Sequence, residues 1–512
     1  MFIKKYKIIP YLVIVLALSV VVFGIRWFIG APIDNQKVYI YLNIIGAIVL
    51  LGFTLVYFMA VLKFPIHKIY LGAGISLGLV FMLIITPNSA ADESNHYYKC
   101  YDFSNLFWGH GITEDSKEHL MRECDANLGL SKDISVENYS YLAEHFFEGS
   151  GNSDMVTMTV DDVTYENKDV LFYFPAILGI IIGRVLGIGG VGTYMLARVL
   201  LFAAYMAITY FALKKIPVLK REFAVILLMP SVLSRASAVT YDGLLMAYIF
   251  LFVAIVAYYI KNKTTIKVAD AIFLVLTGIG ITVAKGGVYL PFLLLLFLIP
   301  KNCFGTKVKY PVVVASAIVL SLVAYCLCNF SLFADLAGSA SETANDLLWT
   351  EEEGYTLKYI LTHPKDSLVM IAKTAMTFGY KWFGEAIGDG YGWLQVYVSP
   401  FLILAYTVIL LVSVANMGED EIVPSKKQKL MMIGIALISS ILVVLSMWIF
   451  WTPLSYEVIV GVQGRYFIPM FMLLIPILKN KYLEIKKDIT NGIILASVLI
   501  VIISAMDIVA SL

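Results

Sequence analysis

An acidic pair, Asp92 and Glu93, stands where a hydrophobic stretch gives way to a long polar segment. Charged side chains at the mouth of a membrane helix are costly, so they usually serve a function. A carboxylate at such a boundary is suited to act as a general base. Adjacent helical residues point about 100° apart, so we expect two roles: one acid accepts a proton, and the other holds a sugar hydroxyl or a neighbouring basic residue. His96 follows Asp92 at the spacing of one helical face. The alternative is that Asp92 only caps a short helix.

Two basic residues further along the chain also lie at the ends of apolar runs. Lys285 lies in Ala284-Lys285-Gly286-Gly287, where one apolar run ends and the next begins. An ammonium group binds phosphate as a point charge, and two glycines allow close backbone approach. Arg465 lies in Gly461-Val462-Gln463-Gly464-Arg465-Tyr466-Phe467 and suits a bidentate contact with phosphate. The alternatives are snorkelling for Lys285 and an ion pair with an outer acid for Arg465.

Further charges lie within or beside apolar runs. Asp242 follows Thr240-Tyr241 and has Arg235 nearby, so a structural ion pair and a substrate contact are both open. Arg198 lies inside an apolar run and is expected to face the protein interior.

The composition places these residues in a membrane protein. The chain has 512 residues, of which 60% are hydrophobic and 15% charged, against about 25% charged in soluble proteins. Apolar runs long enough to cross a bilayer recur along it. We predict about thirteen spans, which begin near Ile8, Val38, Tyr70, Tyr194, Phe223, Leu244, Val268, Val288, Val312, Pro400, Met431, Phe467 and Gly492.

The lysines and arginines predict the orientation. With the N-terminus inside, the short loops on the inner side are all basic, as the positive-inside rule requires. The first span is expected to be a retained signal anchor. The C-terminus and the acidic pair then lie outside the cytoplasmic membrane. This solution requires the stretch 172–186 to be an interfacial helix rather than a span, with Pro175 in its first turn and Phe172, Tyr173 and Phe174 at the headgroup level.

Two large loops are expected outside, at 87–193 and 334–398. Residues 87–170 carry 17 acidic and 5 basic side chains, which excludes nucleic acid as a partner. A solvated surface is the simplest explanation of this charge. Cys100 and Cys124 lie in this loop, and an oxidising compartment favours a disulfide between them, with two free thiols as the alternative. No sequence pattern indicates a metal or a cofactor.

The motifs occur in a recognisable order: Asp-Glu-x-x-His at 92–96, Tyr173-Phe174-Pro175, Ala197-Arg198, Ser237 to Asp242, Ala284-Lys285-Gly286, and Gly461 to Phe467. In this order the chain resembles the GT-C superfamily of polytopic glycosyltransferases. It is most similar to a bacterial family of uncharacterised membrane proteins with Asp-Glu-x-x-His and Gln-Gly-Arg-Tyr-Phe motifs. The resemblance covers about residues 70–480. It leaves two extra N-terminal helices in 1–69 and a C-terminal helix in 481–512. Ala91 stands where many relatives have proline.

The resemblance implies an all-α, GT-C-like fold and an inverting transferase that uses a polyprenyl-phosphate sugar. Asp92 would be the base on the acceptor hydroxyl, with Glu93 beside it. Lys285 and Arg465 would bind the donor phosphate. The other residues expected to contact substrate are His96, Tyr173, Asp242, Gln463 and Tyr466. The acceptor would be a cell-surface glycan or polymer, and a divalent metal has no sequence support.

Two other functions fit a polytopic chain. A transporter or flippase of lipid-linked saccharides would need charges deep in several spans and broken helices near the midplane, whereas the charges singled out here cluster at one surface. A scaffold whose outer loops bind a partner would tolerate loss of Asp92 or Lys285. Polymerase and ligase chemistry on lipid-linked glycans are close neighbours of the transferase hypothesis.

Overall fold

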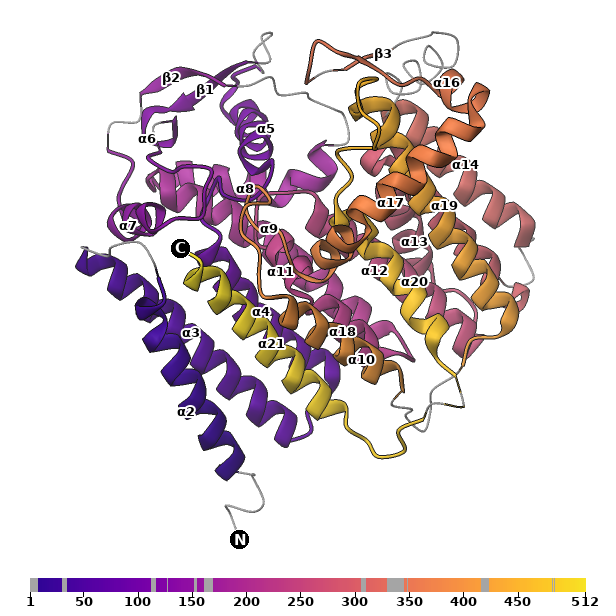
Figure 1. Cartoon of the computed structure of the whole chain (residues 1–512), viewed down its shortest axis with the longest axis horizontal. Coiled ribbons are helices and arrows are strands. Elements are labelled where there is room, and N and C mark those ends of the chain that lie inside the picture. Colours follow the sequence, from indigo (N-terminus) through magenta and orange to yellow (C-terminus); the bar gives the residue numbers. More distant parts are fainter. Residues whose placement is uncertain are drawn as a thin grey trace.

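The computed structural model describes residues 8–29, 35–111, 117–126, 128–151, 154–160, 169–304, 310–328, 345–347, 349–415, 423–480, 482 and 484–512. Within these residues the chain is mostly helical (Figure 1). Two short antiparallel sheets complete it. One pairs β1 (Glu118–Arg122) with β2 (Met155–Thr159), and the other pairs β3 (Asn345–Asp346) with β4 (Glu353–Gly354).

Seven helices are long and apolar enough to cross a membrane: α3 (Gln36–Val61), α4 (Ile66–Ile84), α9 (Gly190–Lys215), α12 (Asp242–Asn262), α13 (Val268–Val283) with η3 (Ala284–Gly287), α19 (Lys426–Trp451) and α21 (Thr490–Ala510). Shorter apolar helices are α2 (Ile8–Gly24), α18 (Pro400–Ala415) and η6 (Gly464–Phe467) with α20 (Ile468–Leu478). This confirms a multi-pass helical membrane protein, but it does not establish the count of thirteen spans.

Two of the expected spans take another form, and a third is present as expected. The one expected from Phe223 is broken into α10 (Lys220–Leu227) and α11 (Pro230–Ala236). Pro230 has no backbone N–H to continue the first helix, so it begins a new one. The stretch expected from Val288 forms the 3-10 helix η4 (Leu290–Leu298). Near Val312 the structure has α14 (Tyr310–Cys328), which follows another 3-10 turn, η5 (Lys301–Phe304).

The loop 87–193 folds into a compact cap at one end of the helices (Figure 1). Besides the β1–β2 sheet it contains α5 (Glu93–Asn105), η2 (Leu106–Trp108), α6 (Glu123–Ala126), α7 (Val136–His145) and α8 (Asp169–Val185). The described part of the second loop holds β3, β4, α16 (Leu357–Thr362) and α17 (Pro364–Ile387) at the same end.

The helix expected at 172–186 is present as α8, and it packs along α9. Two details of its expected setting are wrong. Pro175 lies inside the helix rather than in its first turn, because α8 begins at Asp169. Phe172 and Tyr173 are buried against protein, and only Phe174 is exposed.

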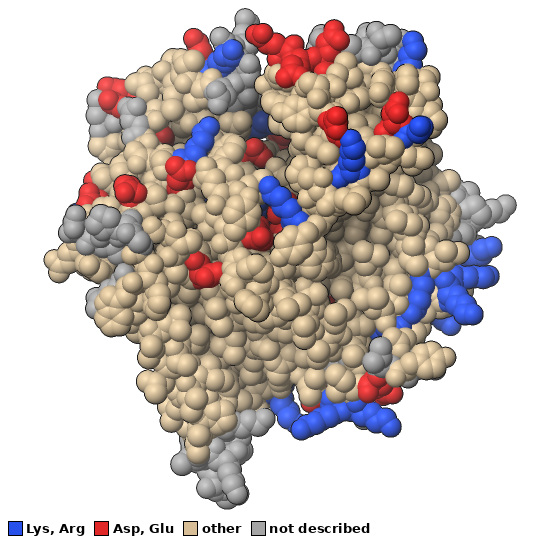
Figure 2. All heavy atoms as spheres, viewed as in Figure 1, with Lys and Arg blue, Asp and Glu red and all other residues tan. Residues whose placement is uncertain are grey.

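Charge is distributed unevenly over the molecule. In Figure 2 lysine and arginine form dense groups at the lower edge and lower right. Acidic side chains lie mainly in the upper half, where further lysines and arginines stand among them. The N-terminal end of α2 points to the lower end, and α21 ends toward the cap. This arrangement has the asymmetry that the positive-inside rule describes.

The expected Cys100–Cys124 disulfide is not formed, and both residues are free cysteines. Cys100 is fully buried on α5, where Lys99 and Asp169 are its charged neighbours. Cys124 lies in α6 beside Arg122 and Asp125. The two thiols therefore face different surroundings.

Candidate functional site

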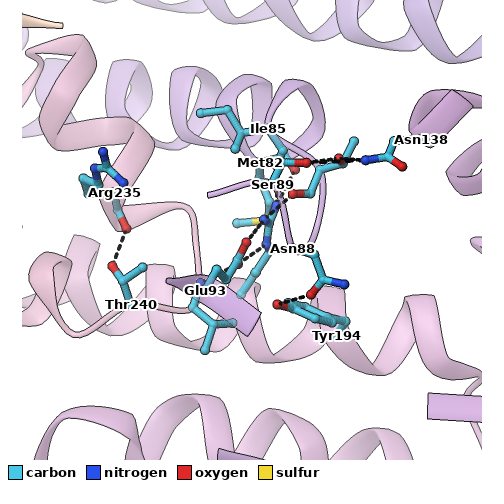
Figure 3. A network of polar contacts seen from close by, with 12 residues as sticks. Met82, Ile85, Asn88, Ser89, Glu93, Asn138, Tyr194, Arg235 and Thr240 are labelled. Carbon is cyan, nitrogen blue, oxygen red and sulfur yellow. Dashed lines mark hydrogen bonds and ion pairs between the residues drawn. The ribbon is translucent and has the colours of Figure 1, made fainter. Parts of the chain in front are cut away.

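Glu93 forms a buried ion pair at the start of α5 (Figure 3). Its carboxylate accepts from Arg198 Nε at 2.7 Å and from the Val239 amide at 2.7 Å, and its side chain is fully buried. Arg198 also donates to backbone carbonyls of the segment that follows α4, such as Thr86 O at 2.8 Å. Glu93 is thus the acid that holds a basic residue, and both of its carboxylate oxygens accept hydrogen bonds. A catalytic role for Glu93 does not fit this geometry, whereas a structural one does. Arg198 faces the protein interior, as expected.

The segment between α4 and α5 is also held from the cap. Asn138 of α7 donates to Thr86 Oγ1 at 3.0 Å, and Tyr194 of α9 donates to Asn88 Oδ1 at 3.2 Å (Figure 3). Trp393, from the second outer loop, donates to Asn88 O at 3.3 Å. Both outer loops therefore fix the backbone that presents Asp92.

Asp92 points away from this structural pair and into a cluster of charges. Its backbone is left-handed, with φ 64°, a conformation that aspartate tolerates better than most residues. Its side chain is half-exposed and does not cap α5, which argues against a purely capping role. Arg465 Nη2 lies 2.9 Å from Asp92 Oδ2. Burial alone would raise the pKa of Asp92, but the charge and hydrogen bond of Arg465 outweigh it and hold the pKa below its usual value.

Asp242 joins both predicted phosphate ligands. It is the first residue of α12, and Lys285 Nζ lies 2.8 Å from its Oδ1. Arg465 Nη1 lies 3.6 Å from its Oδ2. Lys285, Arg465 and Asp92 come from three distant parts of the chain, and Asp242 and Arg465 connect them in one cluster.

Lys285 sits in a strained turn. Lys285, Gly286 and Gly287 all have positive φ, at 45°, 61° and 80°. For a lysine this conformation costs about 1–2 kcal/mol, and such strain concentrates at functional sites. Tyr325 of α14 donates to Gly286 O at 3.2 Å and supports the turn. The lysine is directed over the ring of Tyr466, with Nζ 4.2 Å from its centroid.

Three ring side chains, His96, Tyr173 and Tyr241, pack together next to Asp92. Tyr173 of α8 donates its hydroxyl hydrogen to His96 Nδ1 over 2.6 Å, in the tautomer where that nitrogen is the acceptor. The ring of Tyr241 packs edge-on to His96 and lies 5.0 Å from Lys285 Nζ. Burial and the Lys99 charge lower the pKa of His96 to about 3, although its side chain retains some exposure. His96 is therefore neutral at physiological pH and serves as a hydrogen-bonding group rather than a cation.

The motif 461–467 places Arg465 through a close backbone contact. A Cβ at Gly464 would lie 2.1 Å from Trp382 O and 2.5 Å from Glu385 Cβ, so only glycine fits against α17. Glu385 accepts from the Gly464 amide at 2.5 Å. Gln463 Oε1 and Arg465 Nε are buried, and neither has a hydrogen-bond partner within the described chain. Unsatisfied polar atoms of this kind suit a site that binds a polar ligand.

All the predicted substrate residues lie in or beside this cluster. The sequence analysis did not assign Tyr241 and Glu385 to the site. It also gave Arg235 no definite role. Arg235 was weighed as a partner of Asp242, but Asp242 pairs with Lys285 and Arg465 instead. A signal was present for Tyr241, since it immediately precedes Asp242.

A polar cavity of about 410 Å³ lies in the cap, beside α5. Asn88, Ser94, Asn95 and Tyr98 contribute to its wall, and Lys132 lines it from the segment that precedes α7. Ser94 and Asn95, which line the cavity, follow Asp92 closely in the sequence. In the part of the chain that the structure describes, no group of three metal-ligating side chains occurs.

Comparison with known families decides what this chain is related to. Residues 75–474 match the family described as predicted membrane protein DUF2142. The chain belongs to this family. Nothing among curated proteins and nothing among solved structures matches it. The matched region begins in α4 and ends in α20, so it contains every residue of the charge cluster.

Chemically, this DUF2142 chain offers a half-exposed carboxylate, two cations that share one buried carboxylate, and a group of aromatic side chains beside them. Such a set can bind an anion and accept a proton a few ångströms away.

Proposed function

We propose that this protein is an inverting glycosyltransferase that moves a sugar from a polyprenyl-phosphate donor to a glycan or polymer acceptor at the outer face of the cytoplasmic membrane. The observation that carries the proposal is the arrangement of Asp92, Arg465, Asp242 and Lys285 in one charge cluster. A carboxylate beside an anion site is what phosphate-leaving sugar transfer requires.

In the proposed reaction the acceptor hydroxyl gives its proton to Asp92, and its oxygen attacks the anomeric carbon of the donor sugar. The bond between that carbon and the phosphate oxygen breaks, and polyprenyl phosphate leaves with the electron pair. Lys285 and Arg465 stabilise the charge that develops on the phosphate. The polar cavity beside α5 would receive the acceptor, and its asparagines and Tyr98 suit a hydroxyl-rich chain.

The test compares cells that carry wild-type protein with cells that carry Asp92→Asn at matched membrane levels. Loss of a general base costs about 10²–10⁴-fold in rate, so the variant should lose one surface glycan substituent and accumulate the matching lipid-linked sugar. Mass spectrometry of surface glycans and of polyprenyl-phosphate sugars measures both. Glu457→Gln is the control, because Glu457 is an exposed carboxylate in a surface pair with Lys373. Full glycan modification in Asp92→Asn would contradict the base assignment.

One observation favours a transporter or flippase of lipid-linked saccharide as the second candidate. The α10–α11 break and the η3–η4 turn interrupt helices beside the cluster, and transporters use broken helices at their binding sites. Purified protein separates the two candidates. A transferase forms a new glycosidic bond and releases polyprenyl phosphate when donor and glycan are supplied, whereas a flippase moves the donor across liposomes unchanged.

A further inference from the structure

Arg235 lies in the last turn of α11, next to the charge cluster, yet its guanidinium has no hydrogen bond or ion pair within the described chain. Its side chain is largely shielded from solvent. The charges that act on it most strongly are those of Arg465, Asp242 and Asp92. It is the one cation of the cluster without a counter-ion in the described residues.

The carboxylates around Arg235 are already engaged by other groups. Asp92 pairs with Arg465, and Asp242 pairs with Lys285. Glu385 accepts from the Gly464 amide and has Lys381 at 3.8 Å. None of them is within 4.0 Å of the Arg235 guanidinium, so rearranging one toward Arg235 would break an existing contact.

An unpaired guanidinium that is partly removed from water destabilises a fold, because no ion pair or hydrogen bond compensates for the lost hydration. A fold tolerates this cost when a ligand supplies the missing anion. Arg465 adds to the argument, because its Nε is buried without a partner as well. Two guanidinium groups in one cluster therefore retain unused donors.

The charge count limits what the anion can be. The cluster holds three cations (Lys285, Arg235 and Arg465) and two carboxylates (Asp92 and Asp242), so its net charge is one positive. The nearby pair of Lys381 and Glu385 is neutral and does not change this count. One net positive charge matches a singly charged phosphodiester. A diphosphate carries more negative charge and would leave the cluster net negative.

We propose that Arg235 is the third phosphate-binding residue of this site and that the site recognises a singly charged phosphodiester. This inference rests on the proposed function, since it assigns a ligand contact to the donor end of that same site. Arg235 contributes donors that no protein acid occupies, so it can bind the phosphate before Arg465 leaves Asp92.

The test measures binding of polyprenyl methyl phosphate, a phosphodiester without a sugar, to purified full-length protein in detergent, with uncharged polyprenol as the reference lipid. Wild-type protein should bind the phosphodiester more tightly than polyprenol. Arg235→Gln should weaken phosphodiester binding at least about tenfold, because it removes charge-assisted hydrogen bonds. Arg235→Lys should recover most of the affinity, since it retains the charge. Lys373→Gln, which removes an exposed charge, should bind as the wild type does.

Thermal unfolding of the same variants separates ligand binding from a structural role. Arg235→Gln should melt no lower than wild type, because it removes an unpaired cation that is only partly exposed to solvent. A lower melting temperature with unchanged phosphodiester affinity would overturn the inference and make Arg235 structural. Equal affinity of Arg235→Gln and wild type would also overturn it while leaving the proposed function intact. Failure of the wild type to prefer the phosphodiester over polyprenol would overturn both.

Discussion

At Asp92, the ligand-free protein holds its candidate base in an ion pair. Arg465 lowers the pKa of this carboxyl, and a carboxylate held in this way is a weak proton acceptor. A bound phosphate would compete with Asp92 for Arg465. Donor binding would therefore free the carboxylate and restore its basicity, so the donor should bind before the acceptor reacts.

This competition predicts the effect of Asp92→Asn on donor affinity. Removing the negative charge should tighten binding of polyprenyl methyl phosphate by about threefold to tenfold, because Arg465 no longer has to leave an ion pair. Titration of purified protein measures the change, with Glu457→Gln as the matched loss of a surface carboxylate. Weaker or unchanged binding would mean that Arg465 does not move from Asp92 to the phosphate.

Among the elements, the short turns decide the geometry of the site more than the long helices do. The turn at Lys285 and the helix η6 each bring one cation into the cluster, and each depends on glycine. At Gly464 the reason is steric, because the backbone of η6 lies directly against α17.

We expect Gly464→Ala to disrupt the site. The added methyl group meets Trp382 O and Glu385 Cβ at distances that no rotamer can relieve, so η6 must shift and carry Arg465 with it. Such overpacking costs about 1–3 kcal/mol, and both the melting temperature and phosphodiester affinity should fall.

Gly434→Ala provides the control for this change. Gly434 lies in α19, and a Cβ there would meet nothing within 4 Å. Alanine in a helix should leave stability equal or slightly higher by about 0.5–1 kcal/mol. If Gly464→Ala and Gly434→Ala melted and bound alike, the contact between η6 and α17 would not position Arg465.

At the scale of the whole molecule, the function depends on which side of the membrane carries the cap. The cluster includes Asp92, where the chain enters α5 of the cap, and the densest groups of lysine and arginine lie at the other end of the molecule (Figure 2). The charge rule therefore predicts that the site opens outside the cell.

Labelling of single cysteines in intact cells tests this orientation. In a variant that lacks the native cysteines, Lys373→Cys on α17 should react with a membrane-impermeant maleimide from outside. Lys427→Cys at the start of α19 should react only after permeabilisation. Both positions are exposed, so access depends on the side and not on burial. The reverse pattern would place the site in the cytoplasm and exclude the proposed acceptor.

The sequence by itself determined the membrane class, most helices and four of the charged residues that meet in the cluster. Apolar runs of membrane length and basic loops are local properties, so Val38, Tyr70 and Gly492 mark helices that the structure contains. Charged residues in apolar surroundings are rare enough to stand out individually, so Asp92, Asp242, Lys285 and Arg465 could be selected without a fold.

Only the tertiary structure decided which partner, and therefore which role, each of these residues has. Asp92 and Glu93 are adjacent in sequence, but α9 supplies Arg198 to one and η6 supplies Arg465 to the other. The pairing of Asp242 with Lys285 left Arg235 without a partner, a result that no spacing could reveal. Breaks such as the one before Pro230 and the free thiols of the cap also depend on packing between distant segments. Ion pairs and close backbone contacts are set by three-dimensional neighbours, and a linear pattern does not contain them.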